Sequence, residues 1–146
     1  MEMRVTRARL HQPRMNKLVW YVALGSGIGG AARLLIGNFI QQRVGTSFPL
    51  GTLVINITGS FILGFLIRYA IATPGVGPEM RALLTTGFCG GYTTFSTYSF
   101  ETATLIEDGR YERATLYIVL SVLLALIGVF GGFATARQLL ALRANA

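Results

Sequence analysis

The sequence predicts an all-α integral membrane protein. Of its 146 residues, 52% are hydrophobic and only 13% are charged. The apolar residues gather in four runs, each long enough to cross the roughly 30 Å hydrocarbon core of a bilayer as a helix. Lipid offers no partner to backbone N–H and C=O groups, and no run alternates in the pattern of a membrane β-strand, so helices are the expected spanning elements.

The four predicted spans cover residues 18–40, 50–71, 82–105 and 114–140. An even number of spans places both termini on the same side of the membrane. The connections are too short for a soluble domain, and Pro74 and Pro78, with two glycines between them, mark the middle one as a turn. We therefore expect one domain of four membrane helices at residues 15–146, preceded by a basic, disordered leader at residues 1–14.

The net charge of +7 is assigned to membrane topology rather than to a nucleic-acid partner. Basic residues divide nine to three between the side of the termini and the other side: Arg4, Arg7, Arg9, Arg14, Lys17, Arg68, Arg81, Arg137 and Arg143 against Arg43, Arg110 and Arg113. Four of the nine precede Met15, a second candidate start, and from Lys17 onward the ratio is five to three. So weak a bias predicts that the domain inserts in both orientations.

Three polar residues lie well inside the predicted spans. Arg33 and Glu101 are ionisable, and such residues are costly in lipid and are therefore functional candidates. The plainer interpretations of Arg33 are that it reaches toward an interface or pairs with Glu101. Asn56 carries an amide that lipid cannot satisfy, so it either joins two helices by a hydrogen bond or lines a passage.

Polar side chains follow one face of the second and of the fourth predicted span. Thr52 and Asn56 are four residues apart, and Tyr117, Ser121 and Ala125 have the same spacing. Two such faces can line one narrow path, although Ser and Thr are also common at ordinary helix contacts. Close helix packing is predicted instead by glycines four apart: Gly25 with Gly29, and Gly128 with Gly132.

The stretch GFCGGYTTFST, residues 87–97, is the weakest helix-forming part of the third span. Glycine costs up to about 1 kcal/mol relative to alanine in a helix interior, and Ser and Thr compete for backbone hydrogen bonds. The stretch therefore predicts a helix break that offers carbonyls to a cation and amides to an anion, with a glycine hinge as the alternative. Phe95 and Tyr98 are three residues apart, so we expect neighbouring rings whose edges can contact a small anion.

Three segments carry a family resemblance: GGAAR in the first span, GTLVINITGSFILG in the second and GFCGGYTTFSTYSFET in the third. They are similar to the signature segments of the Fluc family of small fluoride channels, also called CrcB. The resemblance runs over all four spans, from about Met15 to the C-terminus. It implies an antiparallel, dual-topology homodimer in the cell (inner) membrane, with two fluoride pores in each dimer.

By motif position, the resemblance also implies roles for particular residues. Backbone carbonyls of Gly90 and Thr93 from each subunit would hold a structural sodium ion at the dimer centre. The residues that would line the fluoride pore are Asn56, Phe95, Tyr98, Tyr117, Ser121, Thr52 and Ser96. Tyr98 stands where the family commonly has a second phenylalanine, and Glu101 matches the family's acidic residue after the break.

The activity that the resemblance implies is passive export of fluoride from the cytoplasm. The chain has no nucleotide-binding loop that could supply energy. The alternative is a small proton-coupled multidrug exporter, which normally needs a carboxylate in the first span, where residues 18–40 have none. An assembly subunit without transport is a third interpretation. An enzyme is not expected, because no nucleophile and base fall in one site, and the single Cys89 builds neither a disulfide nor a cysteine metal site within one chain.

Overall fold

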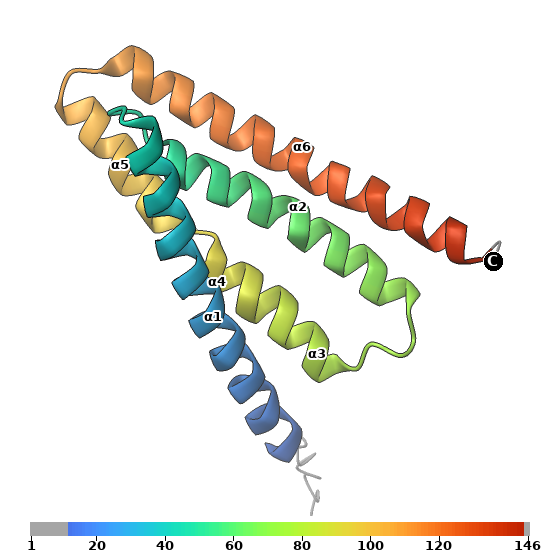
Figure 1. Ribbon diagram of the computed structural model, residues 1–146. Coiled ribbons are helices and arrows are strands. Elements are labelled where there is room, and N and C mark those ends of the chain that lie inside the picture. The colour runs from blue at the N-terminus through green and yellow to red at the C-terminus, as the bar shows by residue number, and fades with distance from the viewer. Residues whose placement is uncertain (1–11, 145–146) are drawn as a thin grey trace, which may run out of the picture.

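The computed structural model describes residues 12–144, which form helices joined by short turns (Figure 1). The long helices are α1 (Gln12–Val44), α2 (Leu50–Ala72) and α6 (Tyr111–Ala144). Four shorter pieces lie between α2 and α6: α3 (Pro78–Ala82), η1 (Leu83–Cys89), α4 (Gly90–Tyr92) and α5 (Phe95–Glu107). No residue from 12 to 144 lies in a β-strand, so the prediction of an all-α chain is confirmed for that range.

Three helices are long and apolar enough to cross a membrane: Lys17–Val44 within α1, and the whole of α2 and α6. They contain the first, second and fourth predicted spans, which confirms a multi-pass helical membrane protein. Both α1 and α6 continue beyond the predicted spans, because polar residues at their ends extend the helix past the apolar run. Residues 1–11 of the predicted leader lie outside the described residues, and residues 12–14 begin α1.

The third predicted span, residues 82–105, falls on several helical pieces rather than on one helix. Its first part, η1, has the wider turn of a π-helix, in which each N–H bonds five residues back. The preceding connection is a turn, as predicted, in which the N–H of Val76 donates to the carbonyl of Thr73 at 3.1 Å. Pro78 then begins α3, where its fixed φ suits the first helical position.

The helices form an open bundle in which α2 lies between α6 and the α3–α4 segment (Figure 1). α2 and α6 run side by side in the same direction, and α1 packs mainly against η1 and α4. The turns after α1 and α5 contain Gly45 and Gly109, with φ of 62° and 72°, a backbone conformation that favours glycine. This arrangement places the start of α5 beside both α2 and α6.

Glycines allow the closest contacts between the helices. A Cβ atom added at Gly128 would lie 2.9 Å from the carbonyl oxygen of Ile57, and one at Gly132 would overlap the α2 backbone. A Cβ atom at Gly25 or Gly29 would overlap backbone carbonyls of η1 in the same way. The predicted packing role of both glycine pairs is therefore confirmed.

Gly132→Ala is expected to destabilise the chain by about 1–3 kcal/mol, because its methyl group would meet backbone atoms that cannot rotate away. Gly131→Ala is the matched control, since its Cβ would meet only the ring of Phe61 at 3.5 Å. Thermal unfolding of both purified variants in the same detergent measures the difference. Equal unfolding midpoints for the two variants would contradict the packing role.

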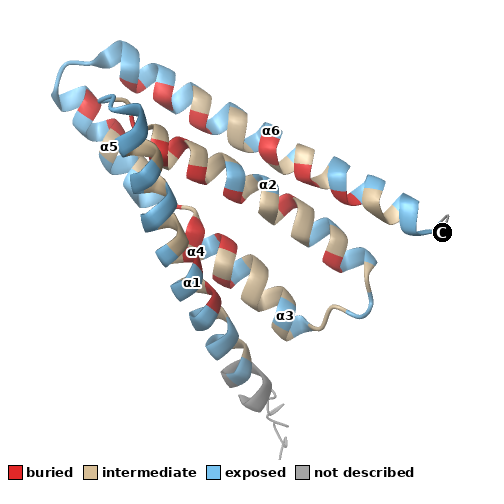
Figure 2. Cartoon of the chain, in the orientation of Figure 1, coloured by how far each residue is buried: buried red, intermediate tan, exposed pale blue. Residues whose placement is uncertain are grey.

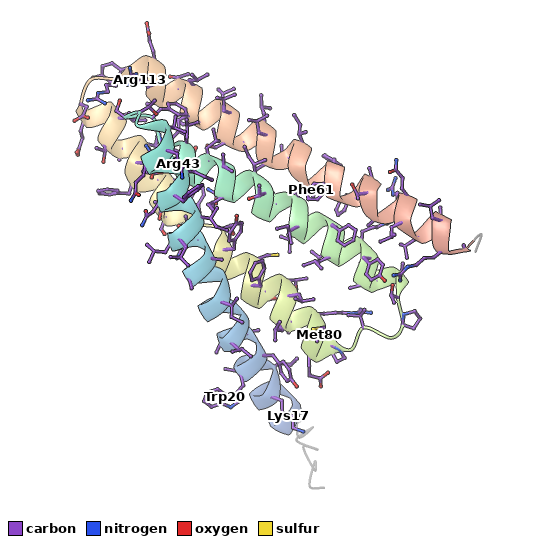
Figure 3. All side chains as sticks on the ribbon, viewed as in Figure 1. Lys17, Trp20, Arg43, Phe61, Met80 and Arg113 are labelled. Carbon is purple, nitrogen blue, oxygen red and sulfur yellow. The ribbon has the colours of Figure 1, made fainter. Side chains whose placement is uncertain are left out.

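Buried residues concentrate where the helices face one another, and exposed residues cover the outer faces (Figure 2). Leu53, Leu105, Ala114 and the fully buried Tyr117 form the apolar core. Large apolar side chains also cover the outside, and Figure 3 shows Trp20 pointing away from the bundle. So much exposed apolar surface is suited to lipid or to a second chain rather than to water.

Candidate ion pathway

The helical chain is interrupted between α4 and α5. Thr93 and Thr94 are extended, with φ and ψ of −83° and 160° for the first and −151° and 113° for the second. The hydroxyl oxygen of Thr94 accepts a hydrogen bond from the N–H of Thr97 at 3.1 Å and so caps the first turn of α5. Thr94 Oγ1 also lies 3.2 Å from the hydroxyl of Ser96, so short polar side chains hold the interruption.

Asn56 of α2 joins this interruption through both ends of its amide group. Its Nδ2 donates to the carbonyl oxygen of Thr94 at 3.1 Å, and its Oδ1 accepts from the N–H of Thr94 at 2.8 Å. One amide therefore satisfies both backbone groups that Thr94 would otherwise leave unpaired. The interpretation of Asn56 as an interhelical hydrogen bond is confirmed, and one N–H of Nδ2 is left over for another acceptor.

The interruption also takes the usual helical donors away from two carbonyl oxygens. In an unbroken helix each N–H donates four residues back, so the N–H of Thr94 would serve Gly90 and that of Thr97 would serve Thr93. In the structure these N–H groups donate to Asn56 and to the Thr94 hydroxyl instead. The carbonyl oxygens of Gly90 and Thr93 can therefore bind a cation or accept a hydrogen bond from another donor.

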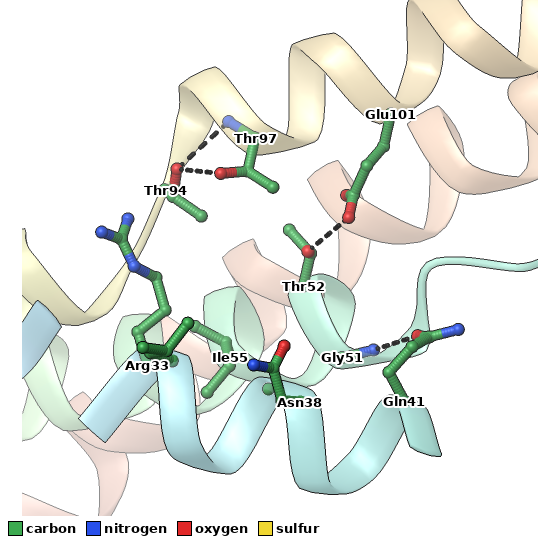
Figure 4. A pocket seen from close by; sticks show the side chains of 11 residues that line it. Arg33, Asn38, Gln41, Gly51, Thr52, Ile55, Thr94, Thr97 and Glu101 are labelled. Carbon is green, nitrogen blue, oxygen red and sulfur yellow. Dashed lines mark hydrogen bonds between the residues drawn. The ribbon is translucent and has the colours of Figure 1, made fainter. Parts of the chain in front are cut away.

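Arg33 of α1 approaches one of these carbonyls. Its Nη1 atom lies 3.5 Å from the carbonyl oxygen of Thr93, a long hydrogen bond that directs the guanidinium toward the interruption (Figure 4). Among residues 17–144 the only ion pair joins Arg110 and Asp108 at 3.6 Å, so the pairing of Arg33 with Glu101 considered above is wrong. The positive charge of Arg33 instead faces the end of α4.

The carboxylate of Glu101 is bound by two hydroxyl groups from different helices. Thr52 of α2 donates to Oε1 at 2.8 Å, and Tyr117 of α6 donates to Oε2 at 2.7 Å. An ionised carboxylate is a strong acceptor, so these two bonds fix the side chains of all three residues. In this arrangement the hydroxyl groups of Thr52 and Tyr117 donate their hydrogen bonds to Glu101, so they cannot donate to an anion at the same time.

A polar cavity of 330 Å³ lies between α1, α2 and α5 (Figure 4). The polar side chains that line it are Arg33, Asn38, Gln41, Thr52, Thr94, Thr97 and Glu101. Arg33 and Glu101 bring opposite charges to its wall, so the cavity contains both a site that attracts anions and a site that repels them.

A second cavity, of 440 Å³, lies between α2, α5 and α6. Its wall includes Asn56, Thr94, Phe95, Tyr98 and Ser121, together with apolar side chains of α6. The hydroxyl oxygen of Ser121 is buried and has no hydrogen-bond partner among the described residues. A buried hydroxyl without a partner is costly, so this group favours a bound ion or water in the cavity. Thr94 lines both cavities.

Aromatic rings extend from the interruption to the core. The ring centroids of Phe95 and Tyr98 are 5.5 Å apart, as their spacing predicts, and those of Tyr98 and Tyr117 are 5.2 Å apart. Both pairs are tilted, so ring edges as well as faces are presented. The side chain of Phe95 is 79% exposed, which leaves the outer side of the second cavity uncovered by this chain.

Comparison with known families shows to which family the chain belongs. The family described as CrcB-like protein, Camphor Resistance (CrcB), matches residues 20–133. The chain belongs to the CrcB family. The match includes α2, the interruption and most of α6, and it confirms the resemblance found in the sequence segments.

Three relatives that the chain covers almost completely carry the name fluoride-specific ion channel FluC. The protein of Rhizobium meliloti (strain 1021) is 44% identical over 125 residues, which cover 86% of this chain and 99% of the relative. That of Geobacter sulfurreducens is 42% identical over 118 residues, covering 81% and 95%, and that of Coxiella burnetii (strain Dugway 5J108-111) is 44% identical over 126 residues, covering 86% and 100%.

The structure of this CrcB chain brings most of the predicted pore residues together. Asn56, Phe95, Tyr98 and Ser121 line the second cavity, and Thr52 lines the first. Tyr117 lies in the core beside them and reaches the first cavity only through Glu101. Ser96 is exposed in the first turn of α5 and lines neither cavity.

The sequence patterns did not point to two residues that shape the candidate pathway of this CrcB chain. Thr94 caps α5 and lines both cavities, and a threonine just before a helical run is a recognisable N-cap signal. Gln41 holds the turn after α1, because its Nε2 donates to the carbonyl of Phe48 at 3.1 Å and its Oε1 accepts from the N–H of Gly51 at 3.1 Å. No local pattern in the sequence predicts those contacts.

Proposed function

We propose that this chain is a fluoride-selective channel that conducts the ion passively. The observation that carries the proposal is the second cavity, where the unpartnered hydroxyl of Ser121, the spare N–H of Asn56 and the ring of Phe95 share one wall. A small, strongly hydrated anion can leave water only where donors replace its hydration shell. The family and the name of the relatives supply the identity of that anion.

Selectivity over chloride follows from the same donors. The Ser121 hydroxyl and the Asn56 amide are fixed donors, and the rings of Phe95 and Tyr98 present weakly positive edges between them. A larger anion fits less closely and gains less from each hydrogen bond, so it does not recover the energy of its lost hydration. Narrowness and donor density thus exclude chloride, and the hydroxyl of Tyr98 adds one more polar group to this part of the path.

The proposed assembly is an antiparallel, dual-topology homodimer with two pores. Residues 78–107 would cross the membrane as the third of four spans, interrupted at Thr93 and Thr94. A second chain would cover the aromatic side chains that one chain leaves outside, above all Phe95 and Phe100, which are 79% and 72% exposed. The weak bias of basic residues supports opposed orientations, because it does not favour one side strongly.

The proposed cofactor is a structural sodium ion at the centre of that dimer. Its ligands would be the carbonyl oxygens of Gly90 and Thr93, which the interruption deprives of their helical donors. Carbonyl oxygens are hard ligands of the kind that hard cations prefer, so these groups fit the ion. Arg33 also approaches the Thr93 carbonyl, and since a carbonyl oxygen has two lone pairs, one atom has room for both.

The proposed direction is export across the cell (inner) membrane. Hydrogen fluoride enters as a neutral acid and dissociates in a more neutral cytoplasm, so fluoride accumulates inside and flows out through an open path. The alternative, a proton-coupled multidrug exporter, is not favoured. It needs a carboxylate that is free to bind a proton and a drug in turn, whereas both carboxylate oxygens of Glu101 accept hydrogen bonds from hydroxyl groups.

Phe95→Ile tests the pore assignment. This substitution is expected to lower fluoride efflux from liposomes at least tenfold, because an aliphatic side chain has no positive edge to contact the ion. Phe130→Ile is the matched control, since Phe130 is an exposed α6 residue that lines neither cavity. Undiminished efflux in Phe95→Ile, or an equal loss in both variants, would remove Phe95 from the pore.

A further inference from the structure

A separate apolar pocket of 340 Å³ lies at the end of the bundle where α2 ends and α3 begins. Its apolar wall is formed by Phe65, Leu66, Met80, Leu84 and Leu139, from α2, α3, η1 and α6. None of these residues lines the two cavities of the proposed pore. The pocket is therefore not part of the ion pathway.

Two arginines adjoin this pocket, and neither has a carboxylate partner in the part of the chain whose side chains are described. The guanidinium of Arg143 lies 5.3 Å from the ring centroid of Tyr69 and donates to its hydroxyl, and Tyr69 lines the pocket. Arg81 also lines it and is held in place by hydrogen bonds from Nε to the Val76 carbonyl at 3.0 Å and from Nη2 to the Ala70 carbonyl at 2.6 Å. Neither arginine forms an ion pair with any residue from 17 to 144. Both keep further N–H groups for an anion.

The charge of this end of the bundle differs from that of the opposite end. Figure 3 shows Lys17 and Met80 at one end, and Arg43 and Arg113 at the other. Among residues 17–144, the Lys17 end carries Lys17, Arg68, Arg81, Arg137 and Arg143 against the single acid Glu79. At the other end, Arg43, Arg110 and Arg113 are balanced by Glu107, Asp108 and Glu112. Only the end that holds the apolar pocket has an excess of positive charge.

We propose that this pocket binds one anionic phospholipid. An acyl chain would occupy the apolar wall, and the lipid phosphate would pair with Arg143 and Arg81 at its edge. Guanidinium groups bind phosphate with two parallel hydrogen bonds, and basic pockets between membrane helices are suited to anionic headgroups. A zwitterionic lipid would bring its own cation close to the arginines, so an anionic headgroup is preferred. The lipid would hold the ends of α2, α3 and α6 together.

Native mass spectrometry of the purified full-length chain in detergent tests the proposal. The protein is titrated with phosphatidylglycerol and with phosphatidylcholine of the same acyl chains. We expect one tightly bound phosphatidylglycerol molecule per chain and weaker binding of phosphatidylcholine. Arg143→Gln should weaken phosphatidylglycerol binding about fivefold, whereas Arg137→Gln, an equal charge change on the same helix, should weaken it much less.

A second variant and a competitor test whether the acyl chain of the lipid occupies the apolar pocket. Met80→Trp places a larger side chain in the apolar wall of the pocket and should displace the lipid. Size-exclusion chromatography and circular dichroism establish that this variant is folded. Inorganic phosphate alone should compete poorly, because it lacks the chain. Equal binding of the two lipids, equal losses in Arg143→Gln and Arg137→Gln, effective competition by phosphate, or unchanged binding in folded Met80→Trp would each overturn the proposal.

Discussion

Asn56→Leu is expected to abolish fluoride efflux and to destabilise the chain. Leucine has a similar volume but removes both hydrogen bonds to Thr94, which leaves one N–H and one C=O unpaired at the interruption. Each unpaired buried group costs about 1–3 kcal/mol. The spare N–H toward the second cavity is lost as well. Fluoride efflux from liposomes that contain the purified protein measures the loss of conduction. Thermal unfolding of the protein in detergent measures the loss of stability.

Asn56→Asp distinguishes conduction from folding. The aspartate keeps an oxygen for the N–H of Thr94 but loses the donor and adds a negative charge to the cavity wall. Repulsion between two unit charges at 4 Å is about 4 kcal/mol at an effective dielectric constant of 20, so the variant should be nearly inactive even where it is folded. Gln138→Leu, which removes an exposed amide from α6, is the control. Normal efflux in a folded Asn56→Asp would contradict the role of the amide.

Tyr117→Phe is expected to lower the stability of the chain by about 2 kcal/mol, since a hydrogen bond to a charged group is worth about 1.5–3 kcal/mol. The substitution removes the hydroxyl that donates to Glu101 Oε2 and leaves the rest of a fully buried ring in place. Tyr111→Phe, at a position 65% exposed, is the matched control. Unfolding midpoints measured in one detergent compare the two variants.

Thr52→Val extends this comparison. Because Thr52 and Tyr117 donate to the same carboxylate, the double variant should lose a different amount of stability from the sum of the single variants. Equal unfolding midpoints for Tyr117→Phe and Tyr111→Phe would contradict a stabilising hydrogen bond between the Tyr117 hydroxyl and Glu101.

Local patterns predicted the three long helices and the contacts that depend on spacing along one helix. Length and hydropathy are properties of one segment, so the apolar runs located α1, α2 and α6 without knowledge of their neighbours. The close packing of Gly128 and Gly132 followed from their spacing on one helix face. The proximity of the Phe95 and Tyr98 rings followed from helical geometry in the same way.

Contacts between distant segments were harder to predict. Thr52, Glu101 and Tyr117 belong to three different helices, and their shared hydrogen bonds depend on how those helices pack. The sequence therefore indicated polar residues at Thr52 and Tyr117 but not that a carboxylate would occupy their hydroxyls. Similarly, the amide of Asn56 could be placed on a helix face, whereas its two bonds to Thr94 required the position of α5.

Efflux traces recorded with a fluoride-selective and a chloride-selective electrode test the central claim most directly. Liposomes that contain only this purified chain are loaded with potassium fluoride in one sample and potassium chloride in another, and efflux is started with a potassium ionophore. The proposed channel should release fluoride within seconds, retain chloride, and need no proton gradient. Release of both anions at similar rates, release only under a proton gradient, or no release of fluoride would contradict it.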